Sequence, residues 1–291
     1  MYVVPVLGLH YACESSAPNI FTVENNTIYA MLLLPENNSY LASISKVAPA
    51  IELTFDKIRK QNILPGWKFN LSMKDTGCDV AYGIWSAIEA YIERPVDVFF
   101  GPYCDYIVAP VARMLKFMQI PLVTSGALAY DFSRYDRTHP QAEYHMLVKT
   151  GWSFTGMART VERIFTKFNW NQSNFIYEED GHPEVMKDHY CFLASKAVHN
   201  VLYAKRNCSV QESKIPSHWT AEELQIWLKK VIGVDNAKHV SIFDLALVSY
   251  QPQTIHQKLR SFLGIGNRTL DDKQMSSQKL AWFGFLQIMH F

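Results

Sequence analysis

The sequence predicts an α/β fold with parallel sheets, arranged as two lobes of which the second is incomplete. Over about the first 125 residues, short apolar runs alternate with amphipathic segments of helical spacing, which is typical of a parallel sheet covered by helices. The same alternation resumes after the polar segment Tyr130–Glu143. With 291 residues and 48% apolar content, the chain is long enough for two lobes with cores of their own.

Short apolar runs bounded by turn residues predict buried strands. In the first lobe these runs are Thr27–Pro35, Lys68–Met73, Val96–Phe100 and Ile120–Gly126. Helical spacing of apolar residues predicts helices at Leu41–Gln61, Asp79–Ile92 and Ile107–Met118. Pro49 lies inside the first of these segments, and we expect it to mark the first turn of that helix, where proline is favoured.

The polar loop at Tyr130–Glu143 is the expected crossing between the lobes. We therefore divide the chain into a first lobe at 28–140 and a partial second lobe at 141–236. Residues 1–27 form an N-terminal segment that ends where the first strand begins, and 237–291 carry no pattern that predicts a fold. In the second lobe, strands are expected at His145–Lys149 and Ser173–Asp180, and helices at Gly151–Phe168 and Glu184–Leu202.

Charge and hydropathy exclude several classes of function. The 28 basic and 27 acidic residues give a formal net charge of +1, without a basic run that would attract nucleic acid or an anionic membrane. No apolar stretch reaches the roughly 18–20 residues that span a bilayer. The short apolar run Val3–Leu9 resembles a poor or clipped signal peptide, and the apolar end at Phe291 suggests a fragment.

Two cysteines follow two predicted strands at the same edge of the sheet. Gly101 and Pro102 make a sharp exit from one strand, and Cys104 comes just after them, while Cys78 follows the preceding strand. Because parallel strands end at one edge, a disulfide between the two is geometrically reasonable and would add about 3.5 kcal/mol of stability. Two reduced, buried cysteines, or a reactive thiol at Cys104, are the alternatives.

Six N-x-[S/T] sequons favour a secreted chain, in which such cysteines pair. They begin at Asn25, Asn37, Asn70, Asn171, Asn207 and Asn267.

Four segments together resemble a known family: "FFGPYCDYIVAPVARM", "ILPGW", "VAPAIEL" and "PLVTSGAL". They are similar to the extracellular hormone-binding domain of natriuretic peptide receptors and receptor guanylate cyclases, which has the type I periplasmic-binding-protein-like fold. The resemblance covers roughly Ile28–Leu202. It implies two Rossmann-like lobes, a disulfide matching Cys78–Cys104, and a homodimer at the plasma membrane's extracellular face that clamps one peptide hormone. It also implies that the membrane span and the catalytic cyclase part, which makes cyclic GMP, are absent from these residues.

The resemblance also implies individual site residues. The family's hormone-contacting positions fall on Tyr106, Arg113, Tyr144, Tyr177 and Phe192. Aromatic and arginine side chains suit such an interface because they offer large contact areas and directed hydrogen bonds. The same residues also suit structural roles, such as a solvated arginine or packed aromatics.

A structural chloride ion is a further feature that the resemblance implies. The family holds it with backbone N–H groups, here those of Tyr103 and Cys104, and with a serine hydroxyl, for which Ser72 is the candidate. A second family disulfide would start at Cys191, and Cys208 is the only nearby candidate for its partner.

Two other functions remain to be weighed against a peptide receptor. The turn Thr124–Leu128 is where small-molecule clamshell proteins place a hydroxyl on a ligand carboxylate, so a receptor for an amino acid is the alternative. An enzyme is not expected, because the chain has no GxGxxG, GxxxxGK[ST], GxSxG or HExxH motif. We therefore expect no catalytic residue, no metal site and no organic cofactor.

Overall fold

The computed structural model describes residues 26–135, 138–139, 142–204, 208–215 and 220–232. All of them fall within one compact unit that ends at Tyr250. Of the expected N-terminal segment 1–27, residues 1–25 lie outside the described residues, and so does the whole expected segment 237–291. Among the described helices, none is long and apolar enough to cross a membrane.

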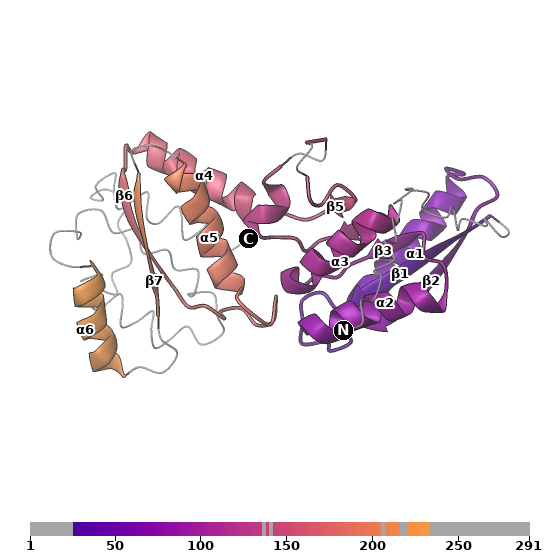
Figure 1. Ribbon diagram of the computed structural model, residues 1–291, viewed down its shortest axis with the longest axis horizontal. Helices are drawn as coiled ribbons and strands as arrows, with labels where there is room; N and C mark the ends of the chain where they lie inside the picture. The colour runs from indigo at the N-terminus through magenta and orange to yellow at the C-terminus, as the bar shows by residue number, and fades with distance from the viewer. Residues whose placement is uncertain (1–25, 136–137, 140–141, 205–207, 216–219, 233–291) are drawn as a thin grey trace, which may run out of the picture. The chain divides into compact units, whose positions relative to one another are not determined.

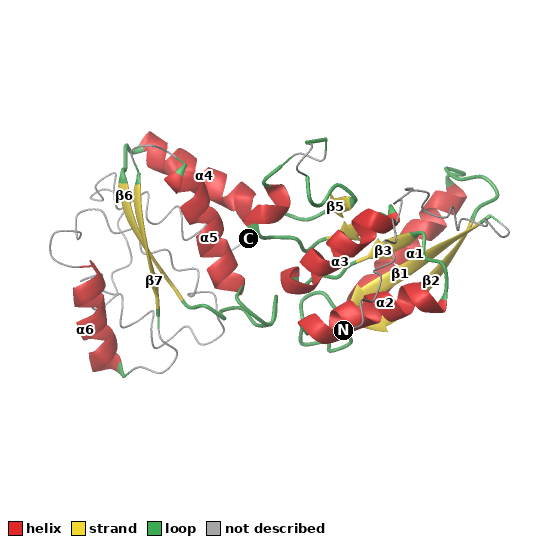
Figure 2. Cartoon of the chain, viewed as in Figure 1, coloured by secondary structure: helices red, strands yellow, loops and turns green. Residues whose placement is uncertain are grey.

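Five parallel strands form the first sheet, in the order β2-β1-β3-β4-β5 (Figure 1, Figure 2). Their bounds are β1 Thr27–Leu34, β2 Lys68–Asp75, β3 Val98–Phe100, β4 Leu122–Thr124 and β5 Leu147–Lys149. The central strand β1 is buried from Ala30 to Leu34, as expected of a strand with helices on both faces.

Three helices connect the first four strands: α1 Ile44–Lys60, α2 Val80–Glu93 and α3 Asp105–Met118. The step from β1 to β2 runs in one direction along the sheet, whereas the later steps run in the other. Because such crossovers are right-handed, α1 covers one face and α2 and α3 cover the opposite face. On the first face, Leu32 and Leu34 pack with Ala48, and Phe55 of α1 stacks on Phe69 at 4.4 Å.

The second sheet is described for two parallel strands, β6 Gln172–Tyr177 and β7 Ser209–Lys214. The surrounding helices are α4 Phe154–Lys167, α5 Tyr190–Tyr203 and α6 Ala221–Ile232, and the short 3-10 helix η1, Tyr130–Ser133, precedes β5. Helix α4 packs against α5. The side chains of Phe154, Phe165 and Phe175 are large and fully buried in these elements.

The predicted α/β fold with a parallel sheet is therefore confirmed, but several elements differ from expectation. Pro49 lies in the second turn of α1 instead of the first, on the exposed face, where water can bond the carbonyl that proline leaves without a donor. Strand β5 pairs with β4, so the predicted strand at His145–Lys149 belongs to the first sheet and not to the second. Helix α5 begins at Tyr190, after a loop that accounts for Glu184–His189.

Candidate functional site

The carboxyl edge of the first sheet has a topological switch point between β1 and β3, because the helices that follow these strands leave toward opposite faces. A hollow of about 360 Å³ lies there. Leu34, Phe55 and Phe100 make part of its apolar lining, and Ser125 and Thr150 supply hydroxyl groups. A site of this composition suits a small, largely apolar ligand with one or two polar groups.

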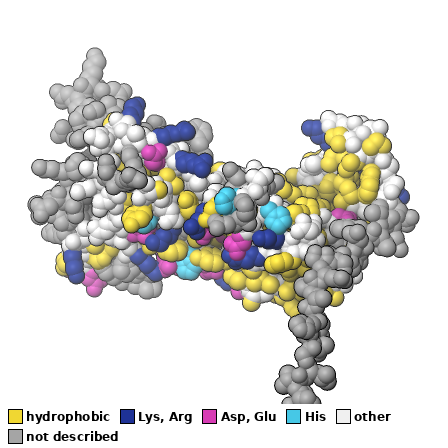
Figure 3. Space-filling model, turned by 45° about the horizontal axis from the view of Figure 1, so that its top comes forward, with side chains coloured by type: hydrophobic (Ala, Val, Ile, Leu, Met, Phe, Trp, Pro, Cys, Tyr) yellow, Lys and Arg dark blue, Asp and Glu magenta, His cyan; other side chains and the backbone are white. Residues whose placement is uncertain are grey.

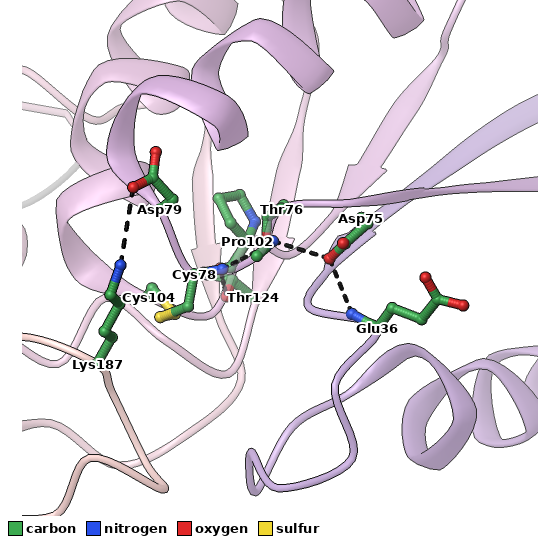
Figure 4. Close-up of a disulfide and its surroundings, with 10 residues drawn as sticks. Glu36, Asp75, Thr76, Cys78, Asp79, Pro102, Cys104, Thr124 and Lys187 are labelled. Carbon is green, nitrogen blue, oxygen red and sulfur yellow. Dashed lines mark hydrogen bonds and ion pairs between the residues drawn. A yellow bond between two sulfur atoms is a disulfide. The ribbon is translucent and has the colours of Figure 1, made fainter.

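The predicted disulfide between Cys78 and Cys104 is present at this edge (Figure 4). The two Cα atoms are 5.8 Å apart, within the range that disulfides require, and both residues are buried. The bridge joins the loop after β2 to the start of α3. Its alternatives, buried thiols or a reactive Cys104, are thereby set aside.

Polar contacts hold the same loops together (Figure 4). The Asp75 Oδ1 atom accepts the backbone N–H groups of Glu36 at 2.9 Å and Gly77 at 2.8 Å, which ties the exits of β1 and β2. The Thr124 hydroxyl donates to the carbonyl of Pro102 at 2.6 Å and so joins the exits of β3 and β4.

Two glycines allow the backbones to approach closely. A Cβ atom at Gly101, whose φ is +75°, would lie 2.2 Å from the carbonyl oxygen of Leu33. A Cβ atom at Gly126 would lie 2.2 Å from the carbonyl oxygen of Tyr103. Real Cβ atoms do not come this close, so larger side chains would force these turns apart.

Asp105, the first residue of α3, is buried and was not singled out by the sequence. Its carboxylate accepts the backbone N–H groups of Leu128 at 2.9 Å and Ala129 at 2.7 Å. Burial raises the pKa of Asp105 to about 6, although these N–H donors and the charge of Lys149 oppose the rise. Asp105 thus fastens the loop after β4 to the start of α3.

One face of α3 carries two of the predicted hormone-contacting residues. Tyr106 and Arg113 are seven residues apart, which places them two turns apart on the same side of the helix, about 10 Å along its axis. The Tyr106 ring contacts the ring of His189 at 5.5 Å, with 37% of the residue exposed.

Arg113 and Tyr144 are brought together by the structure. The guanidinium group of Arg113 lies 5.4 Å from the centre of the Tyr144 ring, a cation–π contact. Arg113 also forms an ion pair with Glu143, which raises the pKa of Arg113 and lowers that of Glu143. Arg113 is therefore held in place rather than freely solvated.

Tyr177 and Phe192 lie at the end of β6 and in the first turn of α5, with ring centres 6.2 Å apart. Tyr177 is buried, so it offers little surface to a ligand, whereas Phe192 is half-buried. His189 links the groups, because its ring contacts Phe192 at 6.1 Å as well as Tyr106.

His189 was not singled out by the sequence. Its Nδ1 atom is 3.2 Å from Glu179 Oε1 and 3.3 Å from Asp180 Oδ1, and Lys214 pairs with the other Glu179 oxygen. A single histidine that follows two acidic residues after a short loop has no sequence signature that could have identified it.

The residues predicted for chloride are not all together. Tyr103 and Cys104 lie in the buried turn after β3. Ser72 pairs with Met31 inside β2, so it does not share that turn. The buried Thr76 follows β2 directly and lies beside Cys78 (Figure 4).

Three of the sequon asparagines are described, Asn37, Asn70 and Asn171, and all three are exposed. Asn25, Asn207 and Asn267 lie outside the described residues. On the face drawn in Figure 3, basic and acidic side chains are intermixed, in keeping with the balanced net charge.

Residues 46–243 match the model of the receptor family ligand binding region, ANF_receptor. The chain belongs to this family. Curated relatives include atrial natriuretic peptide receptor 3 from Homo sapiens, 26% identical over 181 residues, a match that covers 60% of this chain and 32% of the receptor. Atrial natriuretic peptide receptor 2 from Anguilla japonica is 31% identical over 160 residues, covering 53% of this chain and 15% of the receptor.

A receptor-type guanylate cyclase from Caenorhabditis elegans is 28% identical over 148 residues, covering 48% of this chain and 12% of that protein. The chain thus spans less than a third of the length of the relatives it matches, and the matched part is a ligand-binding region and not a catalytic domain. The predicted family is confirmed.

Among solved structures, an ABC transporter substrate-binding protein from Desulfitobacterium hafniense is similar, with a TM-score of 0.51 and 16% identity. The match covers 70% of this chain and 55% of that protein. At this identity the likeness concerns the fold alone, and it confirms the predicted periplasmic-binding-protein-like architecture.

Proposed function

We propose that this chain is the extracellular hormone-binding region of a receptor that recognises a natriuretic-type peptide and signals across the membrane as a dimer. The observation that carries this proposal is the row of side chains along α3. Tyr106 and Arg113 share one face of that helix, His189 and Phe192 extend the row at one end, and Tyr144 extends it at the other. Aromatic and arginine anchors of this kind dominate the binding energy of protein interfaces.

Exposed apolar side chains on α2 and α3 support the dimer. Tyr82, Trp85 and Ile92 recur at helical spacing on α2 and are 50%, 56% and 74% exposed, and Phe117 of α3 is 80% exposed. Helices α2 and α3 pack against each other, so these side chains lie on neighbouring elements. Exposed apolar groups that gather in this way mark interaction surfaces.

Other features support an extracellular location and a bound chloride ion. A disulfide and exposed sequon asparagines are typical of secreted chains. Within the described residues, the backbone N–H groups of Tyr103 and Cys104 donate to no protein acceptor, as an anion site requires. We leave Ser72 out of this chloride site, because its strand position separates it from the turn, and we put the Thr76 hydroxyl in its place.

The test is calorimetry with cyclic natriuretic-type peptides on the full chain secreted from eukaryotic cells. We expect Tyr106→Ala and Arg113→Ala each to weaken binding by about 30-fold or more, as truncation of an interface anchor does. Tyr91→Ala and Arg59→Ala, on other helices, serve as matched controls. Peptide affinity that is unchanged in both α3 variants would overturn the proposed contact surface.

The dimer is tested separately by sedimentation of the wild type and of Trp85→Glu, with and without peptide. A charge in the centre of an apolar interface should shift the equilibrium toward monomer, whereas Glu52→Lys on α1 should not. A wild type that stays monomeric at all concentrations with peptide bound would refute dimer signalling.

The second candidate function is a receptor for a small molecule. The hollow with Ser125 and Thr150 at the switch point favours it, and the similar D. hafniense protein has a structure in complex with Leu. Calorimetry with free amino acids distinguishes the two candidates. If an amino acid bound with micromolar affinity, and if Ser125→Ala but not Ser39→Ala abolished that binding, the proposed ligand would be the amino acid and not a peptide.

A further inference from the structure

A second hollow, of about 630 Å³, lies at the start of α4, away from the switch point. It is bordered by η1, by β5, by the first turns of α4 and by Arg113 of α3. Its size is that of sites for small organic ligands. The lining is mainly polar and charged. Two of its lining residues, Arg113 and Tyr144, are proposed hormone contacts, and no ligand has been assigned to the rest of the lining.

The first turn of α4 leaves one backbone hydrogen-bond donor without a partner at this hollow, among the described residues. The Phe154 N–H donates to the carbonyl of Leu128 at 2.9 Å, and Ser153 caps Gly156 through its hydroxyl at 3.2 Å. The Thr155 N–H donates to no acceptor within the described residues. Free N–H groups at the start of a 14-residue helix attract anions.

The side chain of Thr155 points to the same conclusion independently. Thr155 lines the hollow and is only 4% exposed, and its hydroxyl is buried without a hydrogen-bond partner. A buried hydroxyl without a partner costs free energy, so the site is unfavourable when empty. An oxygen atom of a ligand would satisfy both the hydroxyl and the backbone N–H of the same residue.

The charges around the hollow favour an anion. Arg134, Lys149 and Arg159 line it, and within the described residues none of them has a carboxylate ion-pair partner. Of the acidic lining residues, Glu143 is neutralised by Arg113, which leaves Asp131 against these cations. Arg159 follows Thr155 by four residues, so both lie on one face of α4. Burial lowers the pKa of Lys149, and a bound anion would favour its charged form.

We infer that this hollow is a binding site for a small oxyanion, a carboxylate or a phosphate, held by the hydroxyl and N–H groups of Thr155 and by the side chains of Arg159 and Lys149. Arg113 and Tyr144 also line the hollow, so a bound anion would lie next to two of the proposed hormone-contacting residues. The anion site itself does not depend on hormone binding.

The experiment titrates the full chain with inorganic phosphate, sulfate, acetate and succinate at constant chloride and ionic strength, without peptide, and follows heat and melting temperature. We expect millimolar or tighter binding of at least one class. A response to phosphate and sulfate alone assigns a phosphate-type ligand, and a response to the carboxylates alone assigns a carboxylate.

Thr155→Val gives the sharpest test, because it keeps the shape and removes the hydroxyl. Without anion, its melting temperature should rise by about 2–4 °C, since the buried unpaired hydroxyl is gone. With anion, its affinity should fall at least fivefold, and Arg159→Gln should lower the affinity similarly. Thr160→Val, at an exposed position of α4, should do neither.

Two results would contradict the proposed anion site. The site would be refuted if no oxyanion changed the heat or the melting temperature at concentrations about tenfold above a millimolar dissociation constant. It would also be refuted if Thr155→Val left anion binding unchanged. Because no peptide is present, either result would leave the hormone-binding proposal untouched.

Discussion

The two sheets of the molecule show two ways of stabilising the same β-α-β pattern. In the first sheet, β1 is buried along most of its length, and a disulfide and the buried Asp105 join the strand exits. In the second, β7 has no fully buried residue, and Cys191 and Cys208 lie buried on α5 and just before β7. The difference shows that the cross-links described here concentrate at the edge from which α3 starts.

The largest expected loss of stability comes from removing the disulfide. Cys78→Ser combined with Cys104→Ser should lower the free energy of unfolding by about 3.5 kcal/mol, because the bridge closes a loop with a sequence separation of 26. Urea denaturation of the wild type and the double variant measures this difference. A reductant should destabilise the wild type much more than the variant, and equal sensitivity would show that this bridge does not stabilise the first sheet.

Asp105→Ala should cost about 2–4 kcal/mol, because it leaves the buried N–H groups of Leu128 and Ala129 without their acceptor. The control is Asp131→Ala, at an exposed aspartate in the neighbouring 3-10 helix η1. Chemical denaturation compares the two. A loss no larger than that of the control would mean that the loop after β4 is held without Asp105.

The pH dependence of stability gives a smaller effect with a defined sign. The folded chain raises the pKa of Asp105 from 3.8 to about 6, so between these values it binds a proton that the unfolded chain does not bind. Stability from this group therefore increases as the pH falls through this window, by about 1 kcal/mol between pH 7 and pH 5. Comparing the wild type with Asp105→Asn isolates the contribution, and parallel pH profiles would contradict it.

The smallest effects should come from ion pairs, one near each sheet. Lys74 bonds Glu89 at 2.6 Å and Glu93 at 2.9 Å, whereas Lys196 forms one ion pair within the described part of the chain, with Glu212. Partly exposed pairs contribute little, so Lys74→Met should cost about 0.5–1 kcal/mol and Lys196→Met less than about 0.5 kcal/mol. Thermal melts at low and high salt measure both. A larger loss of stability in Lys196→Met than in Lys74→Met would show that the ion pair near the second sheet contributes more than those near the first.

The first sheet could be predicted from the sequence because strands with both faces covered are continuous apolar runs, as in Met31–Leu34. Strand β7 could not, because its residues are half-buried or exposed and show no apolar run. The partner of β5 was also beyond the sequence, since a three-residue strand after a long loop carries no signal for the sheet it joins.

The candidate site was predictable to a similar degree. The family motif contains Cys104, Tyr106 and Arg113, which lie close together in the chain, and the structure confirms the disulfide from Cys104 to Cys78. Hormone contact by Tyr106 and Arg113 stays a prediction. The role of Asp105 depends on backbone N–H groups more than twenty residues away, and that of His189 depends on a ring contact with Tyr106, which is far away in the sequence. Aspartate and histidine are also common on protein surfaces, so the residue types alone did not reveal either role. The unpartnered Thr155 hydroxyl likewise has no counterpart in the sequence.

The position of β2 at the end of the described sheet has a consequence for producing this protein. An outermost strand presents unbonded amide and carbonyl groups, on which a second molecule can add a strand and start aggregation. Asn70, an exposed sequon residue, lies in the middle of that strand. An attached oligosaccharide would screen the strand, so material made in bacteria should be more prone to precipitate than material made in animal cells.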